Sequence, residues 1–145
     1  DNGDVPEQFL EVIFLLQIVH FDQQLNDKIV ELEQHCSQIA EKIERQYQKE
    51  FEQIGVQLVV ELARFVKGKY SKSYDVFAEN YESIIEIGIE NDEGYFPNAY
   101  IPIWKCKKEM FQMIGYLTKF QPEQIERKIV GIIEEMLEES GEENR

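Results

Sequence analysis

The most regular pattern of apolar and polar positions lies between Leu25 and Ile43. Apolar side chains recur there in alternating steps of four and three residues, at Leu25, Ile29, Leu32, Cys36, Ile39 and Ile43. On an α-helix this spacing places them along one face, with charged residues on the other faces. Because a single helix cannot bury such a face alone, the pattern predicts a helix packed against other helices.

The stretches on either side of this helix indicate more helix. The apolar run before it predicts a first helix over Pro6–Phe21. Between Asp22 and Asp27 either a capped break or a continuous helix is compatible with the residues. Further along, Val56–Val66 is again strongly apolar and predicts a helix, while Gly55 marks a kink, a boundary or a close helix contact.

Turn residues divide the remaining chain into three more expected helices. The first begins at Ser71 or Ser73 and ends near Ile87, the second begins at residues 99–103 and runs to Leu117, and the third covers Ile125–Leu137. We recognise no strand-like alternation. The predicted fold is therefore all-α: a single-domain bundle of five to six helices over residues 1–145, related to a coiled coil, with flexible ends at 1–5 and 141–145.

The last two expected helices suggest self-association. The turn at Gln121-Pro122-Glu123 is short, so these helices should pack as an antiparallel hairpin. Such a hairpin exposes apolar surface unless a core or a second copy covers it. A homodimer through this hairpin is one hypothesis, and its candidate interface residues are Phe111, Ile114, Ile125, Ile129 and Ile132.

The net charge narrows the range of partners. The chain has 145 residues, of which 43% are hydrophobic, and a formal net charge of −14. An acidic surface repels phosphate groups, so nucleic acids and anionic membrane surfaces are not expected partners. No run is apolar enough to cross a bilayer, and Phe9–Phe21 lacks the basic leader of a signal peptide. A cytoplasmic location is expected, with a mature secreted chain as the open alternative.

Few residues suggest catalysis or metal binding. Cys36 and Cys106 belong to no CxxC pair, which favours two reduced thiols over a disulfide between helices. Glu31 and His35 lie one helical turn apart and supply half of a metal site at best. The chain contains no recognisable nucleophile motif and no glycine-rich phosphate loop, so no catalytic residue, metal or cofactor is predicted.

Two basic clusters stand out in this acidic chain. The first surrounds the expected helix end at Gly68 and contains Arg64, Lys67, Lys69 and Lys72; the second contains Lys105, Lys107 and Lys108. Cations at a helix end are favourable in themselves, because they interact with the negative end of the helix dipole. The alternative is that the first cluster binds an acidic peptide or an anionic ligand.

The stretch from Glu93 to Trp104 is the most distinctive in the chain. It brings four aromatic residues into one expected loop and helix start: Tyr95, Phe96, Tyr100 and Trp104. Aromatic side chains near a turn often cover the core, but they are also the residues that ligand pockets and partner interfaces use. These four are therefore the candidate residues for binding a partner or an apolar small ligand.

The second half of the chain resembles the C-terminal half of tetracycline-repressor-type regulators. The resemblance covers Tyr81–Leu137 and rests on a helix followed by Ile87-Gly88-Ile89, on Gly94-Tyr95-Phe96, and on two closing helices separated at Pro122. In that family the last two helices form a four-helix dimer interface and the preceding helices enclose a small apolar ligand. The resemblance implies a dimerising sensor domain, although the family's N-terminal helix-turn-helix has no counterpart here.

Three functional hypotheses follow. The first is a non-enzymatic helical-bundle domain of an intracellular protein that works by docking to another protein, as an adaptor would. The second is the ligand-sensing, dimerising domain that the resemblance implies. The third is an enzyme whose site is not visible in the sequence. Helices more apolar than a small monomer needs favour the first hypothesis.

The charge leads to a first prediction, that the protein does not bind duplex DNA at physiological salt. The negative surface opposes the contacts with phosphate groups that supply most non-specific affinity for DNA. A gel-shift titration at micromolar protein should show only free DNA. A shifted band that disappears as salt is added would contradict the prediction and would identify the Arg64–Lys72 cluster as a DNA contact.

Overall fold

Six strands and two helices make up the part of the chain that the computed structural model describes, residues 14–71 and 75–143. In chain order they are β1 (Leu15–Ile18), α2 (Gln23–Glu52), β2 (Gln57–Val66), β3 (Lys69–Tyr70), β4 (Tyr81–Asn91), β5 (Gly94–Glu109), β6 (Gln112–Thr118) and α3 (Pro122–Glu143). The predicted all-α bundle is therefore wrong, and so is its coiled-coil character. The chain is an α/β protein built on one sheet.

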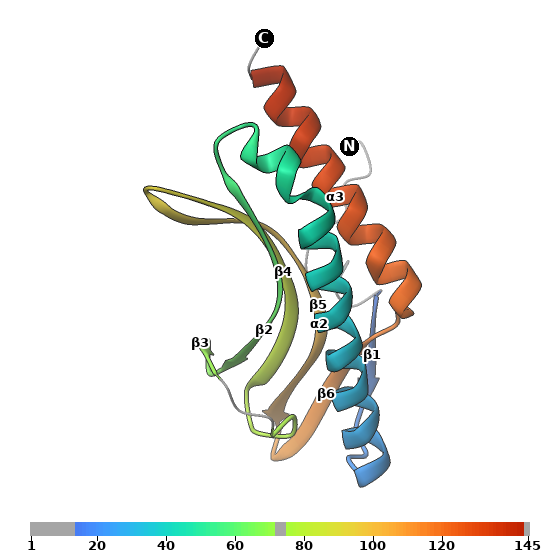
Figure 1. The fold of residues 1–145 in the computed structure, drawn as a ribbon. Coiled ribbons are helices and arrows are strands. Elements are labelled where there is room, and N and C mark those ends of the chain that lie inside the picture. The colour runs from blue at the N-terminus through green and yellow to red at the C-terminus, as the bar shows by residue number, and fades with distance from the viewer. Residues whose placement is uncertain (1–13, 72–74, 144–145) are drawn as a thin grey trace, which may run out of the picture.

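The sheet is antiparallel throughout and has the strand order β1-β6-β5-β4-β2-β3. Both helices lie on one face of it and run in the same direction (Figure 1). The other face is concave, because the long strands bend away from the helices (Figure 1). Two register shifts in the β4–β5 pairing contribute to this bend, since an extra residue in one strand increases its local twist.

The predicted helix over Leu25–Ile43 is confirmed, because it lies within α2. Asp22 caps the start: its carboxylate accepts a hydrogen bond from the Leu25 backbone N–H at 2.8 Å. The chain therefore breaks before the helix, and the alternative of one continuous helix from Pro6 is excluded. The helix ends at Glu52, and Gly55 follows with a φ of +81°, so it marks a boundary rather than a kink.

The core lies between the sheet and the two helices. One face of each helix packs on the apolar face of the central strands, in a cluster that includes Ile39, Ile43, Leu58, Ile85, Ile87, Ile101, Ile129 and Ile133. A second cluster under the first turns of α2 surrounds the buried side chains of Tyr81 and Trp104. Cys36 and Cys106 are both buried and do not form a disulfide in this structure, and burial raises the pKa of the Cys36 thiol to about 12.

Three segments predicted as helices are strands, and their composition explains the error. In β2, Leu58 and Val60 point to the helices while Val59 and Phe65 occupy the opposite face, so the alternation of polar and apolar residues is hidden. β4 contains a run of isoleucines, residue types that pack well on a pleated sheet and favour strand over helix.

The predicted helical hairpin that would form a dimer is also wrong. The segment leading to Leu117 is two strands, β5 and β6, joined by a turn at Met110–Phe111. Ile125 and Ile129 are fully buried in the core of their own chain, Ile114 is buried, and Ile132 is only half-buried. These residues are not available as one dimer interface. The resemblance to the tetracycline-repressor type depends on helices that are strands here and is overturned with them.

The ends of the chain differ from expectation where they are described. The predicted first helix over Pro6–Phe21 includes β1, and its earlier part lies outside the described residues, as does the expected flexible segment 1–5. At the other end, α3 continues through Gly141 to Glu143, so the flexible end expected at 141–145 is helical over its first residues. β1 pairs with β6, which makes the N-terminal strand one edge of the sheet.

Side chains of α2 close the other edge of the sheet. Within the described part of the chain, β3 pairs with Phe65 and Val66, and no strand lies on the outer side of the first half of β2. Gln48 instead donates to the Leu58 carbonyl at 3.1 Å and accepts from the Leu58 N–H at 2.9 Å. Glu44 accepts from the Val60 N–H at 2.9 Å. These bonds satisfy backbone groups that would otherwise invite pairing with another chain.

Two glycines give a matched test of the packing. A methyl group at Gly115 in β6 would collide with the buried Trp104 indole, whereas a methyl group at Gly131 in α3 would meet nothing. We expect Gly115→Ala to destabilise the fold by about 1–3 kcal/mol through overpacking. We expect Gly131→Ala to stabilise it by about 0.5–1 kcal/mol, because alanine loses less conformational freedom in a helix. Urea unfolding of both variants measures this; equal effects would contradict the packing described.

Candidate functional site

The structure separates the four aromatic residues that the sequence singles out. Tyr100 pairs with Glu86 and Tyr95 with Glu90, and the extra residue of β5 between them keeps both tyrosines on the concave face, whereas Phe96 lies on the helix side. Trp104 is 1% exposed, and its indole N–H donates to the Val76 carbonyl at 2.6 Å. Only Tyr95 and Tyr100 therefore belong to one surface, and the predicted aromatic ligand pocket does not form.

Two glutamates face each other at the middle of the concave face. Glu61 of β2 and Glu86 of β4 are direct cross-strand partners, and Tyr100 of β5 lies opposite Glu86 on its other side. Like charges placed opposite each other in an antiparallel pair destabilise the sheet. The pairing of Glu61 with Glu86 thus lowers the stability of the sheet, and the packing of the fold does not require it.

Glu86 is a buried acid on this otherwise open face. Its side chain is only 8% exposed, and its two carboxylate oxygens accept from the Tyr70 hydroxyl at 3.0 and 3.4 Å. Tyr70 itself is 66% exposed and stacks at an angle on Phe65, with 4.6 Å between the ring centroids.

Tyr95 lies next to Gly88 on the same face of the sheet. Its ring lies across Gly88, where any side chain would collide with it. The Tyr95 hydroxyl is fully buried and has no hydrogen-bond partner among the described residues. We call Glu61, Tyr70, Glu86, Tyr95 and Tyr100 the central cluster. It combines a buried carboxylate, a buried hydroxyl without a partner and exposed aromatic surface.

Several groups of the central cluster have shifted pKa values. Partial burial, and then the nearby charges of Glu86 and Glu44, raise the pKa of the Glu61 carboxyl. Burial, followed by the hydrogen bond to Glu86, raises the pKa of Tyr70, and burial followed by the charge on Glu86 raises that of Tyr95. Shifted pKa values are concentrated at functional sites, which makes this cluster the leading candidate.

The basic residues singled out by sequence have different environments. Arg64 lies inside the protein, where its Nε donates to the buried Glu33 at 3.2 Å, and Tyr81 donates to the same carboxylate at 2.7 Å. Lys67 instead shares a hollow of about 270 Å³ with Lys105 and Lys107 of the second cluster. Lys69 is exposed on β3 but does not line this hollow, and Lys72 lies outside the described residues.

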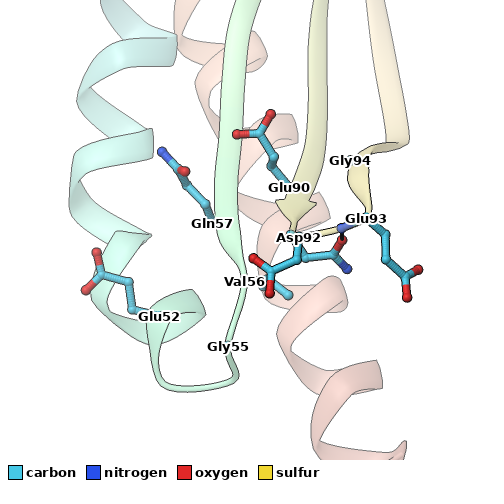
Figure 2. A pocket seen from close by; sticks show the side chains of 9 residues that line it. Glu52, Gly55, Val56, Gln57, Glu90, Asp92, Glu93 and Gly94 are labelled. Atoms are coloured by element: carbon cyan, nitrogen blue, oxygen red, sulfur yellow. Dashed lines mark hydrogen bonds between the residues drawn. The ribbon is translucent and has the colours of Figure 1, made fainter.

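The opposite end of the molecule is acidic. A hollow there is lined by Glu52, Gln57, Glu90, Asp92 and Glu93, whose carboxylates come from the end of α2 and from the β4–β5 turn (Figure 2). The hollow with Lys67, Lys105 and Lys107, which also contains Glu82, is thus a different surface from this acidic hollow. This separation is not visible in the overall composition.

The structure gives little support to a metal site or a membrane span. Within residues 14–71 and 75–143, no three His, Cys, Asp or Glu side chains are grouped so as to hold a metal ion. His20 and His35 are exposed, and neither belongs to the central cluster. The described helices include none with the length and apolar character needed to span a membrane.

Sequence reasoning missed Glu61, Tyr70 and Glu86. A visible signal was the spacing of Glu82, Glu86 and Glu90, which lie at every fourth position. This spacing places them on one face of a strand, but it also places them on one face of a helix, so it did not identify the fold. The pairing of Glu61 with Glu86 depends on strand register, which residues so far apart in sequence do not reveal.

The raised pKa of Glu61 leads to a prediction about stability and pH. Below the ordinary glutamate value of 4.5, Glu61 is protonated in both the folded and the unfolded state. As pH rises above that value the unfolded chain loses this proton first, so the folded state is destabilised. Glu61→Gln should therefore be more stable than wild type at about pH 7 and close to it at about pH 4.

Urea midpoints across this pH range provide the measurement. Glu90→Gln is the matched control, because it removes a carboxylate from the exposed end of β4 on the same face. A gain in stability at neutral pH that is equal in both variants would mean that only net charge matters, and the specific role of Glu61 would be refuted.

Comparisons with known proteins identified no relative. No family model, curated protein or solved structure matched the chain. The inference about function therefore begins from the geometry and charge of the central cluster.

Proposed function

We propose that this chain is a non-enzymatic docking domain, and that its concave face binds a basic segment of another protein. The side chain received at the central cluster would be an arginine or a lysine. The proposal keeps the docking role expected from the sequence and transfers it from a helical surface to the open face of the sheet.

The pairing of Glu61 with Glu86 is the observation that carries this proposal. Two carboxylates lie opposite each other, and one of them is 8% exposed, without a cation beside it among the described residues. A cation from a partner would offset the repulsion between the two carboxylates and donate hydrogen bonds to both of them. Removing a repulsion that exists only in the unbound protein adds directly to the binding free energy.

Arginine fits the cluster better than lysine does. Its planar guanidinium carries five N–H donors in a fork and stacks on aromatic rings. Glu61 and Glu86 offer carboxylate acceptors, and the exposed rings of Tyr70 and Tyr100 offer aromatic surface. Tyrosine and arginine are also common at the centres of protein interfaces.

The net charge supports a basic partner on kinetic grounds. At −14 the chain attracts positively charged proteins over distances comparable with the Debye length and repels acidic ones. Complementary charge mainly raises the association rate and the specificity, while the buried contacts slow dissociation. Long-range attraction and the short-range central cluster would thus favour the same class of partner.

Hydrolysis is the alternative that two neighbouring carboxylates suggest, since acid–base catalysis uses such pairs. Docking is preferred because the central cluster lies on an open face rather than in an enclosed cleft. An open face does not exclude water, and electrostatic catalysis is strongest where water is excluded.

A binding experiment with a defined probe tests the proposal. The probe is a peptide of alternating glycine and arginine, and the control peptide carries citrulline, the neutral analogue of arginine, at the same positions. We expect the arginine peptide to shift amide resonances of the strand residues around Glu61, Glu86 and Tyr100 in isotope-labelled protein. The citrulline peptide should leave them unchanged.

Variants separate a specific site from general attraction. Hydrogen bonds to charged groups contribute about 1.5–3 kcal/mol, so Glu61→Gln and Glu86→Gln should each weaken binding about tenfold or more. Glu138→Gln removes the same charge from the exposed face of α3 and should have little effect. Equal weakening by all three variants, or shifts spread over both helices, would refute the proposal.

A further inference from the structure

Tyrosine rings from three places in the sheet surround Glu86 in the central cluster. Tyr100 of β5 is its cross-strand partner. Tyr70 of β3 reaches it from the other side, and the Tyr70 hydroxyl donates to the carboxylate, at 3.0 and 3.4 Å from its two oxygens. The Tyr95 ring lies across Gly88, the next residue of β4 on the same face. Glu86 therefore lies at the base of a group of aromatic rings.

Two of these rings are open to a partner. Tyr70 is 66% exposed and Tyr100 is 46% exposed. The Tyr70 ring packs on the ring of Phe65, with 4.6 Å between the centroids, which fixes its position over the sheet. Because Glu86 itself is only 8% exposed, a side chain that approaches it contacts the rings as well as the carboxylate.

The burial of Glu86 affects the kind of cation that suits the site. An unmodified guanidinium that donates to Glu86 does so in competition with the Tyr70 hydroxyl, and it gives up hydrogen bonds to water. The attraction between a positive charge and the carboxylate or the rings needs no such bond, and it is stronger where water is excluded. Aromatic cages recognise methylated cations on this basis.

Glu61 provides an accessible acceptor beside the rings. It is exposed, and it lies directly opposite Glu86 on the neighbouring strand. An asymmetrically dimethylated arginine carries two methyl groups on one terminal nitrogen and keeps N–H donors on the other terminal nitrogen and on Nε. Its methylated edge can face Tyr70 and Tyr100 while the other edge donates to Glu61. Methylation keeps the positive charge, so the attraction to both carboxylates remains.

The concave face already has cations placed over a tyrosine ring. Lys105 and Lys107 lie over Tyr116, with 5.7 and 5.6 Å from each Nζ to the ring centroid. Lys105 pairs with Glu82 on one side and with Tyr116 on the other, so a carboxylate, a cation and a ring lie in one row. The central cluster has rings and carboxylates, and a partner would add the cation.

We infer that the central cluster prefers an arginine that is asymmetrically dimethylated. The inference rests on the proposed function, because it specifies the modification of the arginine that the docking face receives. The two methyl groups bury apolar surface against the rings, and a methylated cation loses fewer hydrogen bonds to water on binding. A basic segment of the partner would therefore bind more tightly once it has been methylated.

Calorimetric titration with three peptides of alternating glycine and arginine tests the inference. One peptide is unmodified, one carries asymmetric dimethylarginine, and one carries the symmetric isomer, which has the same atoms and charge but a methyl group on each terminal nitrogen. We expect the asymmetric peptide to bind about fivefold more tightly than the unmodified one, as partial burial of two methyl groups would give. The symmetric peptide should bind more weakly than the asymmetric one.

Variants show whether the rings are the source of the preference. Tyr70→Leu combined with Tyr100→Leu should make the unmodified and asymmetric peptides bind equally; both positions are exposed, so the variant should fold. Tyr70→Phe retains the ring and should retain the preference. Tyr116→Leu is the matched control, because it removes a ring from the same face outside the central cluster, and it should leave the preference unchanged.

The outcomes separate the inference from the proposed function. If the unmodified peptide binds as tightly as the asymmetric one, or if the two isomers bind equally, the inference is overturned while the docking of arginine stands. If none of the three peptides binds, the proposed function is overturned and the inference with it. A preference that persists in the double leucine variant would also overturn the inference, because the rings would not be its source.

Discussion

The whole architecture depends on how α2 is fixed along the outer edge of β2. Gln48 and Glu44 bond to the backbone of Leu58 and Val60 in place of a neighbouring strand. The same contacts hold the helix in register with the sheet, so that its apolar face covers Ile85 and Ile87. An edge strand left open in a sheet this curved would favour association with other chains. Helix α2 thus contributes apolar side chains to the core and also covers the outer edge of β2.

Because both helices pack on one face of the sheet, the side chains on the opposite, concave face are not needed to form the core between sheet and helices (Figure 1). Residues there can be chosen for binding, and three of them break ordinary rules of sheet composition: Glu61 opposite Glu86, and Gly88 beneath the Tyr95 ring. On the helix side, the buried Glu33 is instead fully compensated by Arg64 and Tyr81. The contrast between a buried acid paired with an arginine and a buried acid bonded to a tyrosine hydroxyl distinguishes structure from candidate function within one molecule.

How far the sequence could predict this fold depended on how many faces of each element are buried. α2 was predicted because only one face is apolar, so its spacing is unambiguous. β2 and β4 were missed because Val59 and Ile84 make the concave face partly apolar as well. The β5–β6 hairpin was missed because Met110 and Phe111 replace the glycine and asparagine that usually reveal such a turn. Tyr95 and Tyr100 were found as binding candidates, but their neighbours Glu61 and Glu86 meet only through strand register.

The pairing of β1 with β6 has a consequence for how the chain is made. These two strands are the first and last of the sheet, with paired residues about one hundred positions apart. During synthesis β1 leaves the ribosome long before β6, the strand with which it pairs, exists, whereas the β4–β5 and β5–β6 hairpins form from adjacent residues. The meander and α2 can therefore organise while the chain is still growing, and the strand translated first is the last to enter the sheet.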